Sequence, residues 1–235
     1  MPVTVAIVEA RLRSSRLPAK TMLPLPTGRL VIQEVLYRAS LIKGVTCVVA
    51  ALADDPGTDL LVPWIKNTQD MARDAQRTPI GIFRGPEKDV LRRDLLAAKH
   101  VGAETVIRLT ADCPLLDPNV VGQVLEAYRG GFVDYATNAF PRTWPRGLDC
   151  EVFSMALLEE ADKIGDDQYP GNREGVDVWM QASPNVRRVN IEAPGKMPQD
   201  SRGHIRWTLD TIEDYEVICA EINRRFKRAG DALCE

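Results

Sequence analysis

Residues 11–20 are the part of this chain best suited to chemistry. They follow an apolar run, residues 3–8, that predicts a buried first strand, and their sequence, RLRSSRLPAK, holds four cations, two hydroxyls and one proline. Leu17-Pro18 stiffens the middle of the segment, and Arg16 and Lys20 lie four residues apart, so both could face one ligand. Several cations in one loop indicate an anion of several charges, and we expect a polyphosphate. A solvated basic surface loop is the alternative.

Asp112 and Asp210 are the carboxylates best suited to hold a metal ion. Each follows a predicted strand, residues 104–110 and 205–209 respectively. Open α/β sheets bind ligands at the carboxyl ends of their parallel strands, so both side chains should emerge beside the basic loop. Two carboxylates next to a polyphosphate are what a Mg²⁺ ion bridging phosphate oxygens would use. Each aspartate could instead be only the N-cap of the helix that follows it.

Asp149 and Glu151 form a second pair of carboxylates. They flank Cys150 and, at a spacing of two, project on one face of a predicted strand. They could bind an acceptor substrate or keep a strand edge soluble, and the sequence leaves both interpretations open.

Composition limits the classes of function. A net charge of −3 argues against a generic nucleic-acid or membrane-surface binder, because such a protein needs a net basic face. The sequence contains no apolar stretch of the length a membrane span needs, and its first residues lack the basic start of a signal peptide, so we expect a cytoplasmic protein. The five cysteines form no CxxC pair, and only two histidines are present. Catalysis would therefore depend on carboxylates, cations and a hard metal ion.

Strand-length apolar runs alternate with segments of helical period, which is typical of βαβ units and a mostly parallel sheet flanked by helices. The predicted strands are 3–8, 45–53, 80–84, 104–110, 133–138, 151–153, 186–191 and 205–209. The predicted helices are 30–42, 58 to about 66, 89–101, 119–128, 155–163 and 213–228. The polar segment 67–79 has no clear assignment. We predict one domain, residues 1–235, with a less regular excursion at about 165–202 that carries a candidate apolar subunit contact: Trp179, Met180, Val186 and Val189.

The chain resembles the cytidylyltransferase family that includes the spore coat polysaccharide proteins of the SpsF type, relatives of the acylneuraminate and ketodeoxyoctonate cytidylyltransferases. The resemblance covers most of the length and is carried, in the family's order, by VEARLRSSRLPAKTMLPL, DDPGTDLLV, IFRGPEKDVLRR, VIRLTADCPLLDP, DYATN, GLDCEVFS and GHIRWTLDTIEDYE. It implies a Rossmann-like nucleotidyltransferase fold of the GT-A-like type. It also implies transfer of CMP from CTP to an anionic acceptor, with release of pyrophosphate, in polysaccharide biosynthesis.

The resemblance also implies roles for individual residues. The catalytic residues would be Lys20, Arg16, Arg11 and Asp112. The nucleotide would be bound by Arg11, Ser14, Ser15, Arg16, Lys20, Arg84 and Arg108. Asp112 and Asp210 would hold Mg²⁺. The acceptor, which would be a sugar acid, a phosphorylated small molecule or a phosphonate, would be bound by Asn138, Asp149, Glu151 and Arg173. A homodimer is expected.

Three positions depart from the family's pattern. Arg13 and Ala19 stand where family members usually have glycine, which lets backbone N–H groups approach phosphate closely. Gly175 stands in place of a histidine in the family's Arg-Glu-His segment. Two alternatives therefore stay open beside the cytidylyltransferase: a metal-dependent glycosyltransferase of the GT-A type, and a catalytically degenerate subunit that only binds nucleotide.

Overall fold

The computed structural model describes residues 2–164, 166, 168–195 and 205–231. Its strands are β1 (Thr4–Ala10), β2 (Cys47–Ala53), β3 (Ile80–Gly85), β4 (Thr105–Thr110), β5 (Tyr135–Thr137), β6 (Glu151–Ser154) and β7 (Arg188–Asn190). Its α-helices are α1 (Val31–Ala39), α2 (Val62–Asp74), α3 (Val90–His100), α4 (Pro118–Gly130), α5 (Met155–Lys163), α6 (Asn172–Gly175), α7 (Val178–Ala182) and α8 (Ile212–Asp231). Two short 3-10 helices are η1 (Lys20–Met22) and η2 (Pro56–Leu61).

The strands form one seven-stranded sheet in the order β3-β2-β1-β4-β6-β5-β7. The neighbours β3, β2, β1 and β4 are parallel, as are β5 and β7, while β6 runs antiparallel to both β4 and β5. The expected mostly parallel α/β architecture is confirmed. The carboxyl ends of β1 and β4 lie side by side, since Glu9 is the partner of Thr110 in the register.

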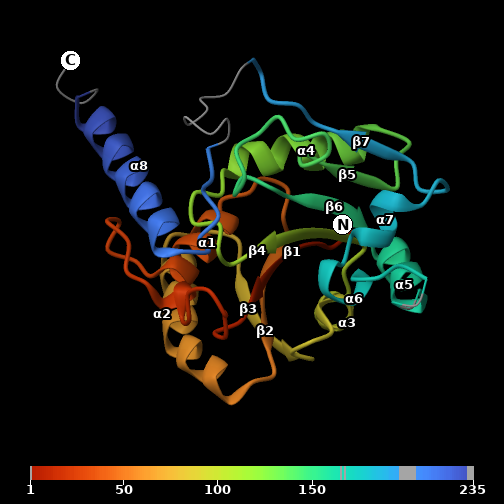
Figure 1. Cartoon of the computed structure of the whole chain (residues 1–235), viewed down its shortest axis with the longest axis horizontal. Helices are drawn as coiled ribbons and strands as arrows, with labels where there is room; N and C mark the ends of the chain where they lie inside the picture. Colours follow the sequence, from red (N-terminus) through yellow and green to blue (C-terminus); the bar gives the residue numbers. More distant parts are fainter. Residues whose placement is uncertain (1, 165, 167, 196–204, 232–235) are drawn as a thin grey trace.

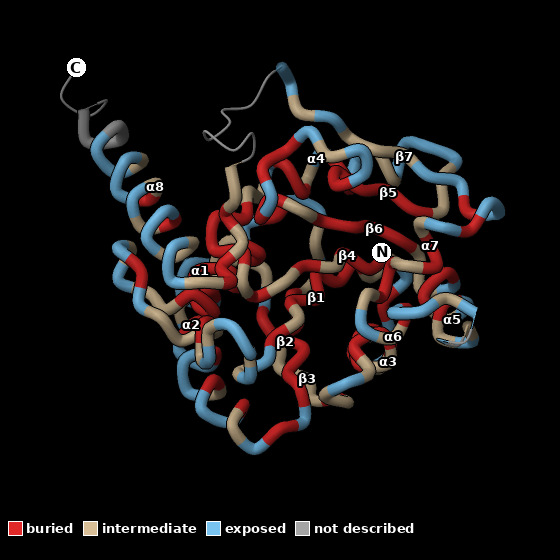
Figure 2. Tube along the Cα trace, in the orientation of Figure 1, coloured by how far each residue is buried: buried red, intermediate tan, exposed pale blue. Residues whose placement is uncertain are grey.

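Helices cover both faces of the sheet, so its central strands are buried on both sides (Figures 1 and 2). Residues of α1, α2 and α4 pack with Ala6 and Val8 of β1 on one face. Residues of α3, α5 and α7 pack with Val5 and Ile7 on the other face. A parallel strand buried on both faces needs a continuous apolar run, which is why the first strand was visible in the sequence.

The last helix, α8, extends from one side of the molecule and ends near the C-terminus (Figure 1). Ile218 and Ile222 of α8 pack in a separate apolar cluster with Val31, Trp207 and Leu209. This packing anchors the segment just before α8, which carries Asp210.

Two predicted elements differ from the structure. Residues 205–209 are not a sheet strand, because among them only Arg206 makes an isolated bridge, to Arg146. The helix expected at 58 to about 66 begins as η2 and continues as α2 to Asp74, so most of the unassigned segment 67–79 is helical. The buried residues of α2, Ile65, Thr68 and Ala72, follow helical spacing, while its charged residues are exposed.

The excursion expected at about 165–202 is partly described, since residues 165, 167 and 196–204 lie outside the described residues. Its described part contains α6, α7 and β7. Trp179, Met180 and Val186 are buried in the chain's own core, and Val189 packs against the core on the other face. These residues therefore do not form the subunit contact that the sequence suggested, and the homodimer stays a prediction.

No helix within the described ranges combines the length and the apolar character that crossing a membrane requires.

Candidate active site

Lys20 is the meeting point of the two predicted metal-binding aspartates. Its Nζ lies 2.6 Å from Oδ2 of Asp112 and 2.9 Å from Oδ1 of Asp210. The three residues come from the first loop, the end of β4 and the segment before α8. Along the chain, Asp112 lies 92 positions after Lys20, and Asp210 lies 190 positions after it. The convergence expected from the sequence is therefore present, with an ammonium group held between two carboxylates.

Neither aspartate is the cap of the helix that follows it. The N-cap of α4 is Asp117, whose side chain accepts from the backbone N–H of Asn119. At the start of α8 the Thr211 hydroxyl accepts from the Asp214 N–H at 3.3 Å, and the Asp214 carboxylate accepts from the N–H groups of Thr211 and Asp210. Other residues thus satisfy the helix ends. The carboxylates of Asp112 and Asp210 are left for the site.

The segment before Asp210 was predicted to be a strand, but backbone contacts outside the sheet hold it. The N–H of Leu209 donates to the backbone oxygen of Asp112 at 2.8 Å, which ties the two aspartate segments together. The N–H of Trp207 donates to the backbone oxygen of Arg146 at 2.6 Å. Gly147, with φ of 103°, permits this approach, because a Cβ there would lie 2.5 Å from the backbone carbon of Trp207.

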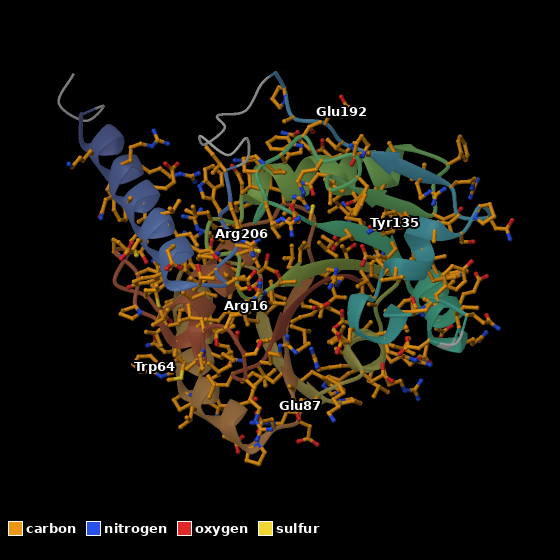
Figure 3. All side chains as sticks on the ribbon, in the orientation of Figure 1. Arg16, Trp64, Glu87, Tyr135, Glu192 and Arg206 are labelled. Atoms are coloured by element: carbon orange, nitrogen blue, oxygen red, sulfur yellow. The ribbon has the colours of Figure 1, made fainter. Side chains whose placement is uncertain are left out.

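Asp210 lies among three cations. Nη2 of Arg16 approaches its Oδ1 at 2.9 Å, and Arg206 pairs with its Oδ2. Arg16 and Arg206 are both labelled in Figure 3. Burial alone would raise the pKa of Asp210, but the hydrogen bond and charge of Lys20, with the charges of Arg206 and Arg16, hold that pKa below its ordinary value. Asp210 is therefore ionised throughout the neutral range.

Two cavities adjoin the first loop. One, of about 730 Å³, contains the shared Lys20 contact and is also lined by the predicted phosphate-binding residues Arg11, Ser14, Ser15 and Arg16. The residues that complete its wall include Glu9, Glu87, Lys88, Arg93 and Glu174. The other cavity, of about 720 Å³, is lined mainly by the same loop and by Asp55, Pro56 and Gly57 after β2.

The loop keeps a glycine-like backbone although it lacks the glycine. Ala19 has φ of 56° and ψ of 23°, the left-handed conformation, and its N–H donates to the backbone oxygen of Leu12 at 3.0 Å. An L-residue with a side chain pays about 1–2 kcal/mol for this conformation. The left-handed conformation of Ala19, directly before Lys20, therefore lowers the stability of the folded protein.

Ala19→Gly should therefore stabilise the protein. Glycine removes the conformational strain at this position but also gives the unfolded chain more conformational entropy. The first effect is larger, so we expect the free energy of unfolding to rise by about 0.5–1 kcal/mol. Urea unfolding should show a higher midpoint. The matched control is Ala127→Gly in the middle of α4, which should lower stability by about 1 kcal/mol. A midpoint that falls in both variants would contradict the strain at Ala19.

The other two departures from the family pattern have local explanations. The exposed Arg13 side chain reaches across the loop, with its Nε 3.2 Å from Asp55 and its Nη1 3.9 Å from Glu87. A Cβ at Gly175 would lie 2.4 Å from Cγ2 of Val178, so the packing here leaves no room for a side chain at that position.

Four predicted site residues lie apart from the two cavities. Arg84 pairs with Asp59. Asn138 is fully buried, donates to the backbone oxygen of Leu148 and accepts from the N–H of Cys150. Asp149 pairs with Arg142, and Arg173 with Asp162 and Asp89. None of the four lines either cavity beside the first loop. The acceptor role expected for Asp149 stays a prediction, and its carboxylate pairs locally with Arg142.

Arg108 and Glu151 lie among several carboxylates, one of which, Glu9, lines the cavity around Lys20. Arg108 donates to both oxygens of Glu9, at 2.5 and 3.3 Å, and also lies 3.4 Å from Glu151 and 3.5 Å from Asp177. Burial raises the pKa of Glu151 to about 8, with Arg108 opposing the rise and the neighbouring carboxylates adding to it. Glu9 and Asp177 were not predicted as site residues from the sequence. A lone charge at the end of the apolar β1 was the only available signal for Glu9.

Comparisons with known proteins identify the family. The family model of cytidylyltransferases matches residues 5–143. The spore coat polysaccharide biosynthesis protein SpsF of Bacillus subtilis is 31% identical over 235 residues, covering 96% of this chain and 87% of that protein. A solved cytidylyltransferase structure from Leptospira borgpetersenii has a TM-score of 0.78 at 29% identity, covering 95% of this chain and 88% of that one.

A second solved structure shows the fold alone. CMP:2-keto-3-deoxy-manno-octonic acid synthetase, complexed with CTP, has a TM-score of 0.66 at 20% identity, covering 95% of this chain and 99% of that one. It shares the Rossmann-like nucleotidyltransferase fold that the resemblance implied. The family match favours a nucleotidyltransferase over the glycosyltransferase alternative. The chain thus belongs to the cytidylyltransferase family and is a CTP-dependent nucleotidyltransferase.

Proposed function

We propose that the chain transfers CMP from CTP to an acid-bearing small molecule and releases pyrophosphate in the cavity around Lys20. The observation that carries this proposal is the contact of one lysine with two aspartates beside a loop of arginines and serines. Cations for a triphosphate and carboxylates for a metal ion are the two groups that nucleotidyl transfer needs together.

The first loop would bind the triphosphate. Arg11, Ser14, Ser15 and Arg16 line the cavity, and the arginines offer several N–H donors each to phosphate oxygens. The adjoining cavity of about 720 Å³ has apolar walls from Leu12, Pro18 and Pro56, which suit the flat face of a base. We place the nucleoside there, in contact with the residues after β2 instead of Arg84.

Asp112 and Asp210 would hold the divalent metal ion, for which we propose Mg²⁺. The donor set fits, because both are hard oxygen ligands and they already share one cationic group, Lys20. Among the described residues no group of three or more His, Cys, Asp or Glu side chains could hold a metal by itself. Phosphate oxygens and water would therefore complete the coordination, as Mg²⁺ prefers. When bound, the metal would supply charge stabilisation to the phosphates.

The chain's own residues would then favour attack at the α-phosphorus. Arg11, Arg16 and Lys20 would stabilise the negative charge that gathers on the departing pyrophosphate. An acceptor carboxylate or phosphate is already anionic, so its oxygen attacks in line without a strong protein base. The shortage of histidine is no obstacle to such a reaction.

The acceptor would enter at the end of the cavity formed by Glu9, Lys88 and Arg93. Lys88 offers positive charge for the acid group of the acceptor. Glu151, predicted to bind the acceptor, lies next to this end through its contact with Arg108. We propose no acceptor role for Asn138, Asp149 or Arg173, since their side chains are committed elsewhere.

A matrix of four nucleoside triphosphates against carboxylated and phosphorylated acceptors, read out by pyrophosphate release, tests the proposal. We expect turnover that needs CTP, a divalent metal ion and an acid-bearing acceptor together. Release of pyrophosphate with no acceptor requirement would contradict the transfer. Calorimetry that shows CTP binding while every acceptor fails would favour the degenerate subunit instead.

A further inference from the structure

The place between Asp112 and Asp210 is taken by an ammonium group. Nζ of Lys20 lies 2.6 Å from one oxygen of Asp112 and 2.9 Å from one oxygen of Asp210. A Mg²⁺ ion that both aspartates bind must lie between the same two carboxylates, since its oxygen ligands are only about 2.1 Å away. Two cations repel each other at this range. The lysine and the metal ion are therefore alternative partners of the aspartate pair.

The neighbouring charges strengthen this competition. Oδ1 of Asp210 is shared by Lys20 and Arg16, and its Oδ2 pairs with Arg206, which also lies 3.4 Å from Asp214. The described groups that balance one another are three carboxylates and three cations: Asp112, Asp210, Asp214, Arg16, Lys20 and Arg206. While all three cations stay in place, a divalent ion would find little uncompensated negative charge here.

Lys20 has a second possible partner in the same cavity. Its side chain is only 11% exposed, and the cavity that it lines is also lined by Arg11, Ser14, Ser15 and Arg16. These four residues are the ones proposed to bind the triphosphate. A lysine carries its charge on a flexible stem with three donors, so a rotation of the side chain can turn Nζ from a carboxylate to a phosphate oxygen.

We propose that Lys20 blocks the metal site until a nucleotide binds. Without nucleotide the ammonium group stays between the aspartates. The triphosphate attracts Lys20 and Arg16 to itself, and the two aspartates then become available to the metal ion. The inference rests on the proposed function, from which it takes the role of the aspartates, and adds an order of binding. By linkage, the metal ion would strengthen CTP binding by the same factor by which CTP strengthens metal binding.

Mn²⁺ binding without nucleotide, followed by the EPR signal of the free ion, tests the first half of the proposal. We expect Lys20→Met to bind Mn²⁺ at least about tenfold more tightly than the wild-type chain, because two carboxylates lose the ammonium group between them. Lys20→Arg keeps a positive charge and should bind Mn²⁺ as weakly as the wild type. Lys43→Met, at an exposed position, is the matched control and should also leave the affinity unchanged.

Calorimetry with CTP in EDTA tests the second half of the proposal. Lys20→Met should weaken CTP binding at least about tenfold, because it removes one cationic partner of the triphosphate. One substitution would thus strengthen the binding of the metal ion and weaken that of the nucleotide. A variant that merely folds badly would weaken both. In the double variant Lys20→Met, Asp112→Asn, the gain in Mn²⁺ affinity should disappear, which would locate the ion at the aspartates.

Mn²⁺ binding in Lys20→Met that is equal to or weaker than in the wild type would overturn the proposal, as would a gain that survives in the double variant. The order of binding would be contradicted if CTP does not bind the wild type in EDTA, or binds Lys20→Met equally well. None of these measurements uses an acceptor or pyrophosphate. Failure of every acceptor in the turnover matrix would therefore contradict the proposed function, and the two binding experiments would still decide the role of Lys20.

Discussion

Lys20→Met should lower the rate of pyrophosphate release from CTP by about 10²–10³-fold, which corresponds to about 3–4 kcal/mol of transition-state stabilisation. The lysine Nζ contacts both Asp112 and Asp210, and Lys20 lines the cavity where the triphosphate would lie. Methionine keeps the length of the side chain and removes its charge. The effect should therefore appear in kcat more than in folding.

The matched control for this substitution is Lys43→Met at an exposed position outside both cavities. It should retain wild-type turnover. Circular dichroism and urea unfolding should show that the Lys20 variant is folded, because Arg16 and Arg206 still neutralise Asp210. Turnover of the Lys20 variant within threefold of wild type would remove the lysine from the mechanism.

Asp112→Asn and Asp210→Asn should each reduce turnover by about 10²–10³-fold and shift the metal dependence to higher concentrations. Both side chains would contribute an oxygen to the same ion, and a neutral amide is a weaker ligand for a hard cation. The double variant should lose little more than either single variant, because residues that act on one ion are not additive. Steady-state rates measured across a Mg²⁺ titration check all three.

Asp74→Asn, an exposed position at the end of α2, serves as the control for these aspartate variants. It should leave both the rate and the metal dependence unchanged. Multiplicative losses in the double variant, or a Mg²⁺ titration that matches wild type in either single variant, would show that the two carboxylates do not share an ion.

Local signals predicted most of the sheet and the approach of Asp112 to the first loop. The apolar runs of β1, β2 and β4 are continuous because helices bury both faces, so their positions followed directly from the sequence. Asp112 was found by the rule that ligands bind at the carboxyl ends of parallel strands. The helix predicted at 89–101 begins where expected, with Asp89 as the N-cap of α3 accepting from the N–H of Arg92.

Asp210 was predicted to lie beside the first loop, and it does contact Lys20. The strand that was expected to position it is absent, because residues 205–209 form only an isolated bridge. The apolar and polar alternation of residues 205–209 suggested a strand, whereas the segment is held by the contact of Leu209 with Asp112 and by the approach of Trp207 to Gly147. Both contacts join residues far apart in the sequence. Local patterns carry no information about them, and the same is true of the cap that Thr211 and Asp214 form.

The carboxylates around Arg108, which are Glu9, Asp94, Glu151 and Asp177, were not predicted as a cluster, because they come from separate elements. Asp94 shares the buried face of α3 with Leu91 and Leu95, and only the packing of that face on β1 brings it to Glu9. Arg108 was assigned to the nucleotide through the resemblance, but its contacts are with carboxylates. Tertiary packing, and not the motif, decides what such a residue binds.

The central claim is that the first loop, Asp112 and Asp210 form one site for CTP and a divalent metal ion. A crystal structure of the chain with CTP and Mn²⁺, with the metal located by anomalous scattering, tests it most directly. We predict an anomalous peak between the carboxylates of Asp112 and Asp210, with the triphosphate against Arg11, Arg16 and Lys20. A peak away from both aspartates, or a triphosphate outside the loop, would contradict the account.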